Sequence, residues 1–212
     1  MTEKTAQKEP GKKPVPSKKP KPQQEVVVQI PLSELHPFPD HPFQVREDAS
    51  MQETAESVKE YGVLVPALAR PREDGGYELI AGHRRKHACE LAGLATMPVI
   101  VRDIDRDAAT IIMVDSNLQR ENILPSERAK AYKMKMEAIK RQGARTDLTS
   151  PKISAKFRSD DEVGQDAGVS GDTIRNYIAL TQLVPELQQM VDEKKIALTP
   201  ACLLYTSPSP RD

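Results

Sequence analysis

Two arginines beside a glycine are the first residues that could do chemistry. Residues 77–81 read YELIA, which predicts a strand, and Gly82, His83, Arg84 and Arg85 follow at the start of a predicted helix. Cations in the first turn of a helix oppose the macrodipole and cost about 0.3–1 kcal/mol each, so local stability does not explain them. A bound anion would, because backbone N–H and guanidinium groups would both point at it. We predict a phosphate site; the alternative is a surface helix whose arginines pair with nearby acids.

A metal site on the same helix is a competing hypothesis. His83 and His87 are four residues apart, which is the spacing of two metal ligands on one helix face. Three cationic side chains lie between them and would repel a divalent ion, and Cys89 lies off that face. We therefore interpret His87 as a structural residue.

A second polar group ends the helix predicted for residues 105–122. Aliphatic residues at positions 111, 112, 114 and 118 form its apolar stripe. Asn117, Gln119 and Arg120 then appear where that stripe needs no hydrogen-bonding groups. An amide side chain offers a donor and an acceptor together, as base or ribose edges require. The alternative is a solvated helix end.

Residues 161–180, DEVGQDAGVSGDTIRNYIAL, have the spacing of a helix-turn-helix. Gly164 lets two helices cross closely, Gly168 supplies a positive φ at the turn, and Ile174 returns to the core. Ser170 caps the second helix, whose exposed early positions suit base edges, because arginine prefers guanine and asparagine prefers adenine. The candidate DNA-contacting residues are Ser170, Gly171, Asp172, Thr173, Arg175 and Asn176. The alternative is a generic helical hairpin.

The helix predicted for residues 126–142 is basic. With its immediate continuation it carries seven basic side chains, Lys135 among them, against two acidic ones. Its packing face consists of Ala129, Tyr132, Met136 and Ile139, and the candidate phosphate contacts are Lys133, Lys140 and Arg141. Residues 152–198 have six basic and eight acidic groups, so the helix-turn-helix needs this helix or a dimer partner to bind DNA.

The elements that must position these residues begin with a small α/β unit over residues 25–104. Apolar runs at residues 25–30, 63–71, 77–82 and 97–101 predict four strands, and Pro66 and Pro71 suggest that the second is an edge strand or bends. Residues 50–53 form a capping-box pattern for a helix that Gly62 ends. Gly75 and Gly76 mark a turn between strands.

The remainder is predicted to be helical. Asp105 caps one helix, Pro125 and Ser126 open the next, and Gly143 ends it. A polar linker follows over residues 143–158, then short helices over residues 159–198. Residues 202–212 lose periodicity, and we expect an irregular, truncated or artefactual end. The predicted fold class is an α/β N-terminal domain followed by an all-α helix-turn-helix domain.

Composition excludes several classes of protein. The 212 residues include only two cysteines, too few for a disulfide framework or a thiolate metal cluster. No apolar run approaches the roughly 18 residues of a spanning helix, and no secretory signal opens the chain, so we expect a cytoplasmic protein. Residues 1–24 hold seven lysines against two glutamates and predict a disordered tail, either solvated or partner-docking.

The ordered motifs together resemble the ParB family of chromosome and plasmid partition proteins. The resemblance covers residues 26–200 through HPFPDHPFQVRED, GVLVP, GHRRKHA, NLQRENILPSERA and the helix-turn-helix. It implies a ParB N-terminal CTP-binding domain over residues 25–124. It also implies a DNA-binding domain over residues 125–201, with the helix-turn-helix at about residues 160–182, and a C-terminal dimerisation domain that we expect to be absent here.

The resemblance implies a centromere-like, site-specific DNA-binding protein of a partition system. CTP would close its homodimer into a clamp that slides along double-stranded DNA, and CTP would be hydrolysed slowly. A ParA-type Walker ATPase would be its motor. The protein would be cytoplasmic, associated with the nucleoid or replicon. The alternatives are a helix-turn-helix transcription regulator without a nucleotide switch, and a ParB-like nuclease. A sulfiredoxin-like enzyme would need a cysteine where His83 stands.

Carried over by motif, Gly82, Arg84 and Arg85 would hold the triphosphate. The other implied nucleotide residues are Arg46, the loop from Gly62 to Pro66, His83, Asn117, Gln119 and Arg120, with Asn117 also a magnesium ligand. Two acidic residues usual in the family are replaced by His83 and Ser116, and the neighbouring Asp115 is rotated about 100° away on its helix. These departures argue against magnesium-dependent hydrolysis more than against nucleotide binding, and they leave the catalytic residues unassigned.

Overall fold

The sheet domain is built on five short strands in a computed structural model that describes residues 26–120, 122–146 and 159–206. The strands are β1 (Val27–Pro31), β2 (Leu35–Pro37), β3 (Ala67–Pro71), β4 (Tyr77–Ala81) and β5 (Thr96–Val101), and a 3-10 turn, η1 (Leu32–Glu34), separates the first two. Their order is β1-β5-β3-β4-β2. The pairs β1–β5 and β3–β4 are antiparallel, and β3–β5 and β2–β4 are parallel.

The position of β3 corrects one prediction. The strand lies at the centre of the sheet between β5 and β4, so the edge alternative is wrong, whereas the register shift between Leu68 and Ala69 against β4 is compatible with the predicted bend. Pro66 precedes it and Pro71 is its last residue, so neither missing N–H interrupts the middle of a ladder. Residues 63–66 are not part of the strand, and Leu64 and Val65 are 78% and 64% exposed.

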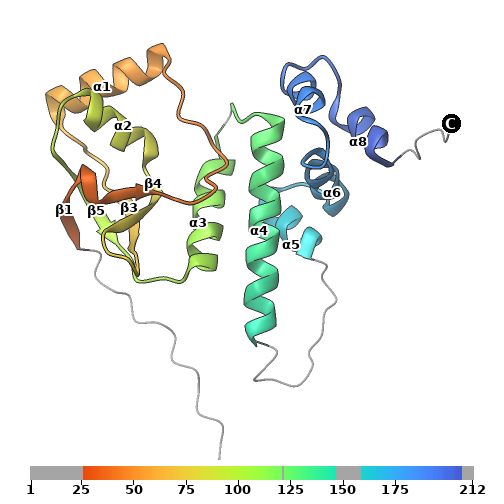
Figure 1. Cartoon of the computed structure of the whole chain (residues 1–212), viewed down its shortest axis with the longest axis horizontal. Coiled ribbons are helices and arrows are strands. Elements are labelled where there is room, and N and C mark those ends of the chain that lie inside the picture. Colours follow the sequence, from red (N-terminus) through yellow and green to blue (C-terminus); the bar gives the residue numbers. More distant parts are fainter. Residues whose placement is uncertain (1–25, 121, 147–158, 207–212) are drawn as a thin grey trace, which may run out of the picture.

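Two helices cover one face of the sheet (Figure 1). Helix α1 (Ala49–Tyr61) buries Met51 and Val58, and α2 (His83–Leu91) buries Ala88 and Cys89, in one cluster with β-strand residues. The predicted capping box is wrong by two residues, because the Asp48 side chain accepts from Met51 N and caps α1. Gly62 ends the helix with φ 71° as predicted.

Helix α3 (Arg106–Leu118) packs on the opposite face of the sheet. Neighbouring residues of a strand point to opposite faces, and in β4 Leu79 joins the core cluster of α1 and α2 whereas Ile80 joins that of α3. The Asp105 side chain accepts from Ala108 N, which confirms the predicted cap. The helix ends at Leu118 rather than at residue 122, so Gln119 is its C-terminal cap.

A long helix, α4 (Pro125–Thr146), stands between the sheet domain and the remaining helices (Figure 1). It does not stop at Gly143. Its Ala131 packs with α3, and its Tyr132 packs with α5 (Ser159–Ala167) and α6 (Gly171–Leu180). Because α4 belongs to both cores, the domain boundary at residues 124 and 125 stays a prediction.

Helices α7 (Pro185–Asp192) and α8 (Leu198–Thr206) complete the described chain. Helix α8 corrects the expectation of irregular structure from residue 202, since it continues to Thr206 and buries Ala201 and Cys202. The predicted tail, most of the predicted linker and residues 207–212 lie outside the described residues. The α/β unit followed by helices confirms the predicted fold class. Among the described helices, none is both long and apolar enough to cross a membrane.

Candidate functional site

A cavity of about 260 Å³ opens where β4 ends and α2 begins. Three elements enclose it: the segment before α1, the first turn of α2 and the C-terminal end of α3. The residues that line it are His41, Phe43, Gln44, Val45, Ala81, Gly82, His83, Arg84, Arg85, Ser116, Asn117 and Arg120. His41 and Ser116, which are 75 residues apart in the sequence, therefore both line the cavity at the helix start for which we predicted a phosphate site.

Gly82 forms the corner between strand and helix. Its φ of 117° is in the region that only glycine adopts easily. A Cβ there would lie 2.8 Å from Ala67 Cβ in the central strand. No other residue fits without a shift of the strand, and the first turn of α2, whose N–H groups lack intrahelical acceptors, lines the cavity.

The two arginines have different partners. Arg84 Nη2 donates to Ser50 Oγ at 3.1 Å and lies 3.9 Å from Asp48 Oδ1. Arg85 Nη1 donates to the carbonyls of Val65 and Pro66 at 2.6 and 2.7 Å, and burial lowers the pKa of its guanidinium. Arg85 thus fixes the loop before β3 to α2, whereas Arg84 has only weak, exchangeable partners and is the better anion ligand.

The α3 side of the cavity is held by hydrogen bonds to its own helix. Asn117 Nδ2 and Ser116 Oγ donate to Met113 O at 2.8 and 2.9 Å. Asn117 Oδ1 accepts from Arg120 Nη1 at 3.2 Å. One amide oxygen, already facing a guanidinium, is a poor donor set for magnesium, which prefers carboxylates and phosphates. No carboxylate is among the described residues that line this cavity, so the residues do not fit the magnesium site that the family resemblance implied.

Two histidines line the cavity: His83, which the sequence analysis predicted, and His41, which it missed. The rings of His41 and His83 are 3.9 Å apart between centroids. Burial, with smaller contributions from His41, Lys86 and Arg120, lowers the pKa of His83 to about 3, and burial also lowers the pKa of His41. Both Nε2 atoms are buried, and neither has a partner among the described residues. Burial therefore keeps both imidazoles neutral beside the cavity.

A second cavity, of about 400 Å³, adjoins the first and shares Arg84 and Arg120 with it. Arg46 lines it beside Asp48 and Glu127. The carboxylate of Glu127 accepts from Gln44 N at 3.1 Å and from Leu124 N at 3.2 Å, and so ties the cavity loop to the start of α4.

The structure brings together most, but not all, of the predicted nucleotide residues. Gly82, His83, Arg84, Arg85, Asn117 and Arg120 share one cavity, and Arg46 lies next to it. Pro66 reaches the site only through Arg85, and neither Gly62 nor Gln119 lines either cavity. His87 contacts Glu47 and Glu90 at 3.4 Å, as a structural residue would. The missed residues His41, Phe43 and Gln44 belong to the HPFPDHPFQVRED motif, where polar residues inside a proline-rich loop were the available signal.

The local features expected of a helix-turn-helix are present in α5 and α6. A Cβ on Gly164 would lie 2.6 Å from Val169 O, so only glycine permits this crossing. Gly168 has φ 68°, and Ser170 Oγ accepts from Thr173 N at 3.2 Å. Ile174 is fully buried.

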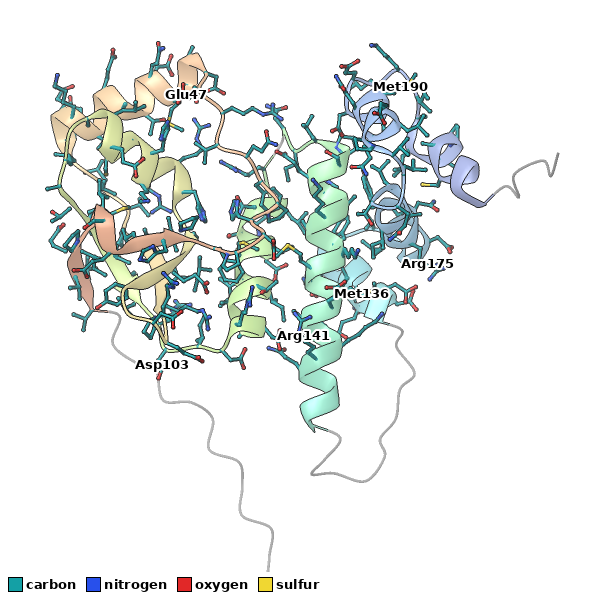
Figure 2. The ribbon with its side chains drawn as sticks, in the orientation of Figure 1. Glu47, Asp103, Met136, Arg141, Arg175 and Met190 are labelled. Carbon is teal, nitrogen blue, oxygen red and sulfur yellow. The ribbon has the colours of Figure 1, made fainter. Side chains whose placement is uncertain are left out.

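The exposed face of α6 differs from the sequence prediction at three residues: Gly171 is buried, and Thr173 and Asn176 are half-buried. A Cβ on Gly171 would collide with Asp161 Oδ1, so this residue packs closely against α5. Arg175 is paired with Asp160 of α5 and Asp172 of α6, and lies at the lower edge of this helical group (Figure 2). Two carboxylates thus hold its guanidinium in one orientation.

The basic residues of α4 divide among three environments. Lys133 and Lys140 are two turns apart on the solvent side of the helix. Lys133 is half-buried and Lys140 is exposed. Arg141 Nε donates to Asp107 Oδ1 of α3 at 2.8 Å and lies on the α3 side of the helix (Figure 2). Lys135, counted with the basic surface in the sequence, is 1% exposed and contributes nothing to it.

Comparison with known proteins follows this geometry. The ParB N-terminal domain family matches residues 16–118. The chain is 35% identical over 187 residues to the chromosome-partitioning protein Spo0J of Thermus thermophilus and 31% identical over 175 residues to stage 0 sporulation protein J of Bacillus subtilis. These alignments cover 87% and 82% of the chain but only 62% and 56% of the relatives, so the chain spans about half to two thirds of their length.

Solved structures agree with this result. One is a C-terminally truncated chromosome-partitioning ParB from Caulobacter crescentus complexed to the centromeric parS site, at TM-score 0.55 and 26% identity, covering 86% of this chain and 87% of that one. A Pnob8-like ParB-N domain shares the fold at TM-score 0.57 and 18% identity, covering 85% of this chain and 79% of that one. The family match, the curated relatives and the fold shared with a solved ParB lead to one conclusion: the chain belongs to the ParB family of partition proteins.

Proposed function

We propose that this chain is a site-specific DNA-binding partition protein that holds a cytidine triphosphate in the cavity at the start of α2 and is switched by it. The observation that carries the proposal is the arginine-lined cavity at the glycine-led helix start. The free N–H groups of α2 and the guanidinium of Arg84 suit the phosphates, and the neutral imidazoles of His41 and His83 line the same cavity. The adjoining cavity beside Arg46 offers room for the rest of the nucleotide.

Binding, rather than hydrolysis, is what the residues support. Positive charge comes from Arg84 and Arg120, and no catalytic residue is assigned. A carboxylate that could hold magnesium or activate water is missing from the described lining of the first cavity, which also weighs against a nuclease. Slow CTP hydrolysis would therefore need groups beyond these.

The test of the nucleotide proposal is Arg84→Ala. Because charge-assisted hydrogen bonds contribute about 1.5–3 kcal/mol, we expect CTP affinity to fall about 10- to 100-fold in calorimetric titration. Arg72→Ala, at the β3–β4 turn, removes the same charge from a distant site and should leave affinity unchanged. If Arg84→Ala and Arg72→Ala bind CTP as the parent does, the alternative of a transcription regulator without a nucleotide switch is favoured.

The DNA proposal rests on α5 and α6. Their tight crossing at Gly164 and the capped α6 have the geometry that places a recognition helix in the major groove, and a related ParB has been solved on its centromeric site. We infer that Arg175 and Asn176 face base edges. Asp160 and Asp172 would orient the guanidinium of Arg175. Lys133 and Lys140 are inferred to contact the phosphate backbone.

Arg175→Ala should separate the two kinds of contact. We expect it to weaken binding to a parS duplex by about 1–3 kcal/mol while binding to random duplex stays the same, because a base contact carries the sequence information. Lys140→Ala should instead weaken both duplexes alike and reduce the salt dependence. Fluorescence anisotropy on both duplexes at several salt concentrations measures this, and a uniform loss with Arg175→Ala would contradict its role.

The wider assembly is inferred from the family. We propose a homodimer that slides as a clamp on double-stranded DNA at the nucleoid or replicon. The motor would be a ParA-type Walker ATPase docked by the basic residues 1–24, which lie outside the described chain.

A further inference from the structure

Lys135 of α4 is among the largest fully buried side chains of the described protein. Its Nζ donates to Asp115 Oδ1 of α3 at 2.7 Å and to Asp166 Oδ2 of α5 at 2.9 Å. Only 1% of the lysine side chain is exposed, whereas the two aspartates are 46% and 57% exposed. We call this three-residue set the Lys135 network. It joins three helices through one cation.

Both ends of the Lys135 network lie next to proposed binding sites. Asp115 directly precedes Ser116 and Asn117, which line the cavity. Asp166 lies in α5 between Gly164, where α6 crosses, and the turn at Gly168. A displacement of the end of α3 by a ligand would therefore be transmitted to α5 through Lys135.

Stability alone does not account for the Lys135 network. Burial by itself would lower the pKa of Lys135, but the hydrogen bonds that Lys135 donates to Asp115 and Asp166, with the attraction of their charges, outweigh burial and raise the pKa, so the lysine stays charged. Apolar residues of similar volume in place of a buried ionic network are often neutral or stabilising. What an ionic network adds is a defined geometry, because each member is satisfied in only one arrangement of the helices. The apolar cluster that holds Leu118, Tyr132, Met136 and Val163 has no such directional contacts.

We propose that the Lys135 network is the connection that couples the cavity to the helix-turn-helix. This inference rests on the proposed function, since the coupled ligands are CTP and the DNA site. Lys135, Asp115 and Asp166 are positioning residues: they touch neither ligand, and they set how occupancy of one site changes affinity at the other.

The test measures parS-duplex affinity with and without CTP in the full chain. We expect CTP to change duplex affinity in the parent by about fivefold or more. In the apolar replacement Asp115→Leu, Lys135→Met, Asp166→Leu, each ligand alone should bind within about twofold of the parent. The ratio of affinities with and without CTP should fall to about one. Asp166→Asn should reduce this ratio in part. If thermal unfolding shows that the triple replacement does not fold, Asp166→Asn takes its place in the test. Glu162→Gln removes the same charge from an exposed position of α5 and should keep the parent ratio.

The outcomes are distinguishable. If the parent binds both ligands, and the apolar variant and Asp166→Asn keep the parent's ratio of duplex affinities with and without CTP, the coupling is overturned. The proposed function then still stands. A parent whose ratio is already one also overturns the coupling. A parent that binds no CTP overturns the proposed function itself, before any variant is compared.

Discussion

Replacing Gly82 with valine should lower the free energy of unfolding by about 3 kcal/mol and abolish CTP binding. The residue has φ 117°, which costs an L side chain about 1–2 kcal/mol, and its Cβ would meet Ala67 Cβ at 2.8 Å. Ala67 is fully buried in the central strand and cannot move away. The corner would have to open, and the first turn of α2, which carries Arg84, would leave the cavity.

Gly75→Ala is the matched control. This glycine also has a positive φ, 90°, but nothing lies within 4 Å of the position of its Cβ. It should cost about 1 kcal/mol from strain alone and leave the CTP titration unchanged. Denaturant unfolding and CTP calorimetry on both variants measure the difference. A Gly82→Val protein with parental stability and CTP affinity would show that neither the clash nor the corner matters.

Gly164→Val should have the second large effect, at the other site. Its Cβ would meet Val169 O at 2.6 Å and Gly171 N at 3.2 Å, and both are backbone atoms. Overpacking of this kind costs about 1–3 kcal/mol, and the crossing of α5 and α6 would be lost. We expect parS-duplex binding to disappear while CTP binding persists, because the cavity is built from β4, α2 and the end of α3.

The neighbouring substitution Gln165→Ala provides the control for α5. Gln165 is exposed, so its truncation should change neither unfolding nor DNA binding. Circular dichroism, duplex anisotropy and CTP titration on the two variants follow the three properties separately. If Gly164→Val still bound the duplex at parental affinity, α5 and α6 would not be the DNA-binding unit.

Local signals in the sequence determined most of the elements and several of their ends. The caps Asp105 and Ser170 and the turns at Gly62 and Gly168 depend on hydrogen bonds and backbone angles within a few residues, so they can be read from the chain. The corner at Gly82 could be read in the same way, because a glycine with following arginines is a contiguous feature. The capping box failed for a related reason: two acceptors, Asp48 and Ser50, competed within three residues, and only one occupied the cap.

The tertiary structure alone decided which side chains meet. No local pattern indicates that His41 stacks on His83, that Arg85 donates to backbone carbonyls, or that β3 becomes the central strand. Lys135 is the clearest case, since in the sequence it is one lysine of a basic helix and in the fold it is buried between two aspartates from other helices. Charge and helical period set what a residue can do, but burial and partners depend on segments far apart along the chain, and only packing brings those segments together.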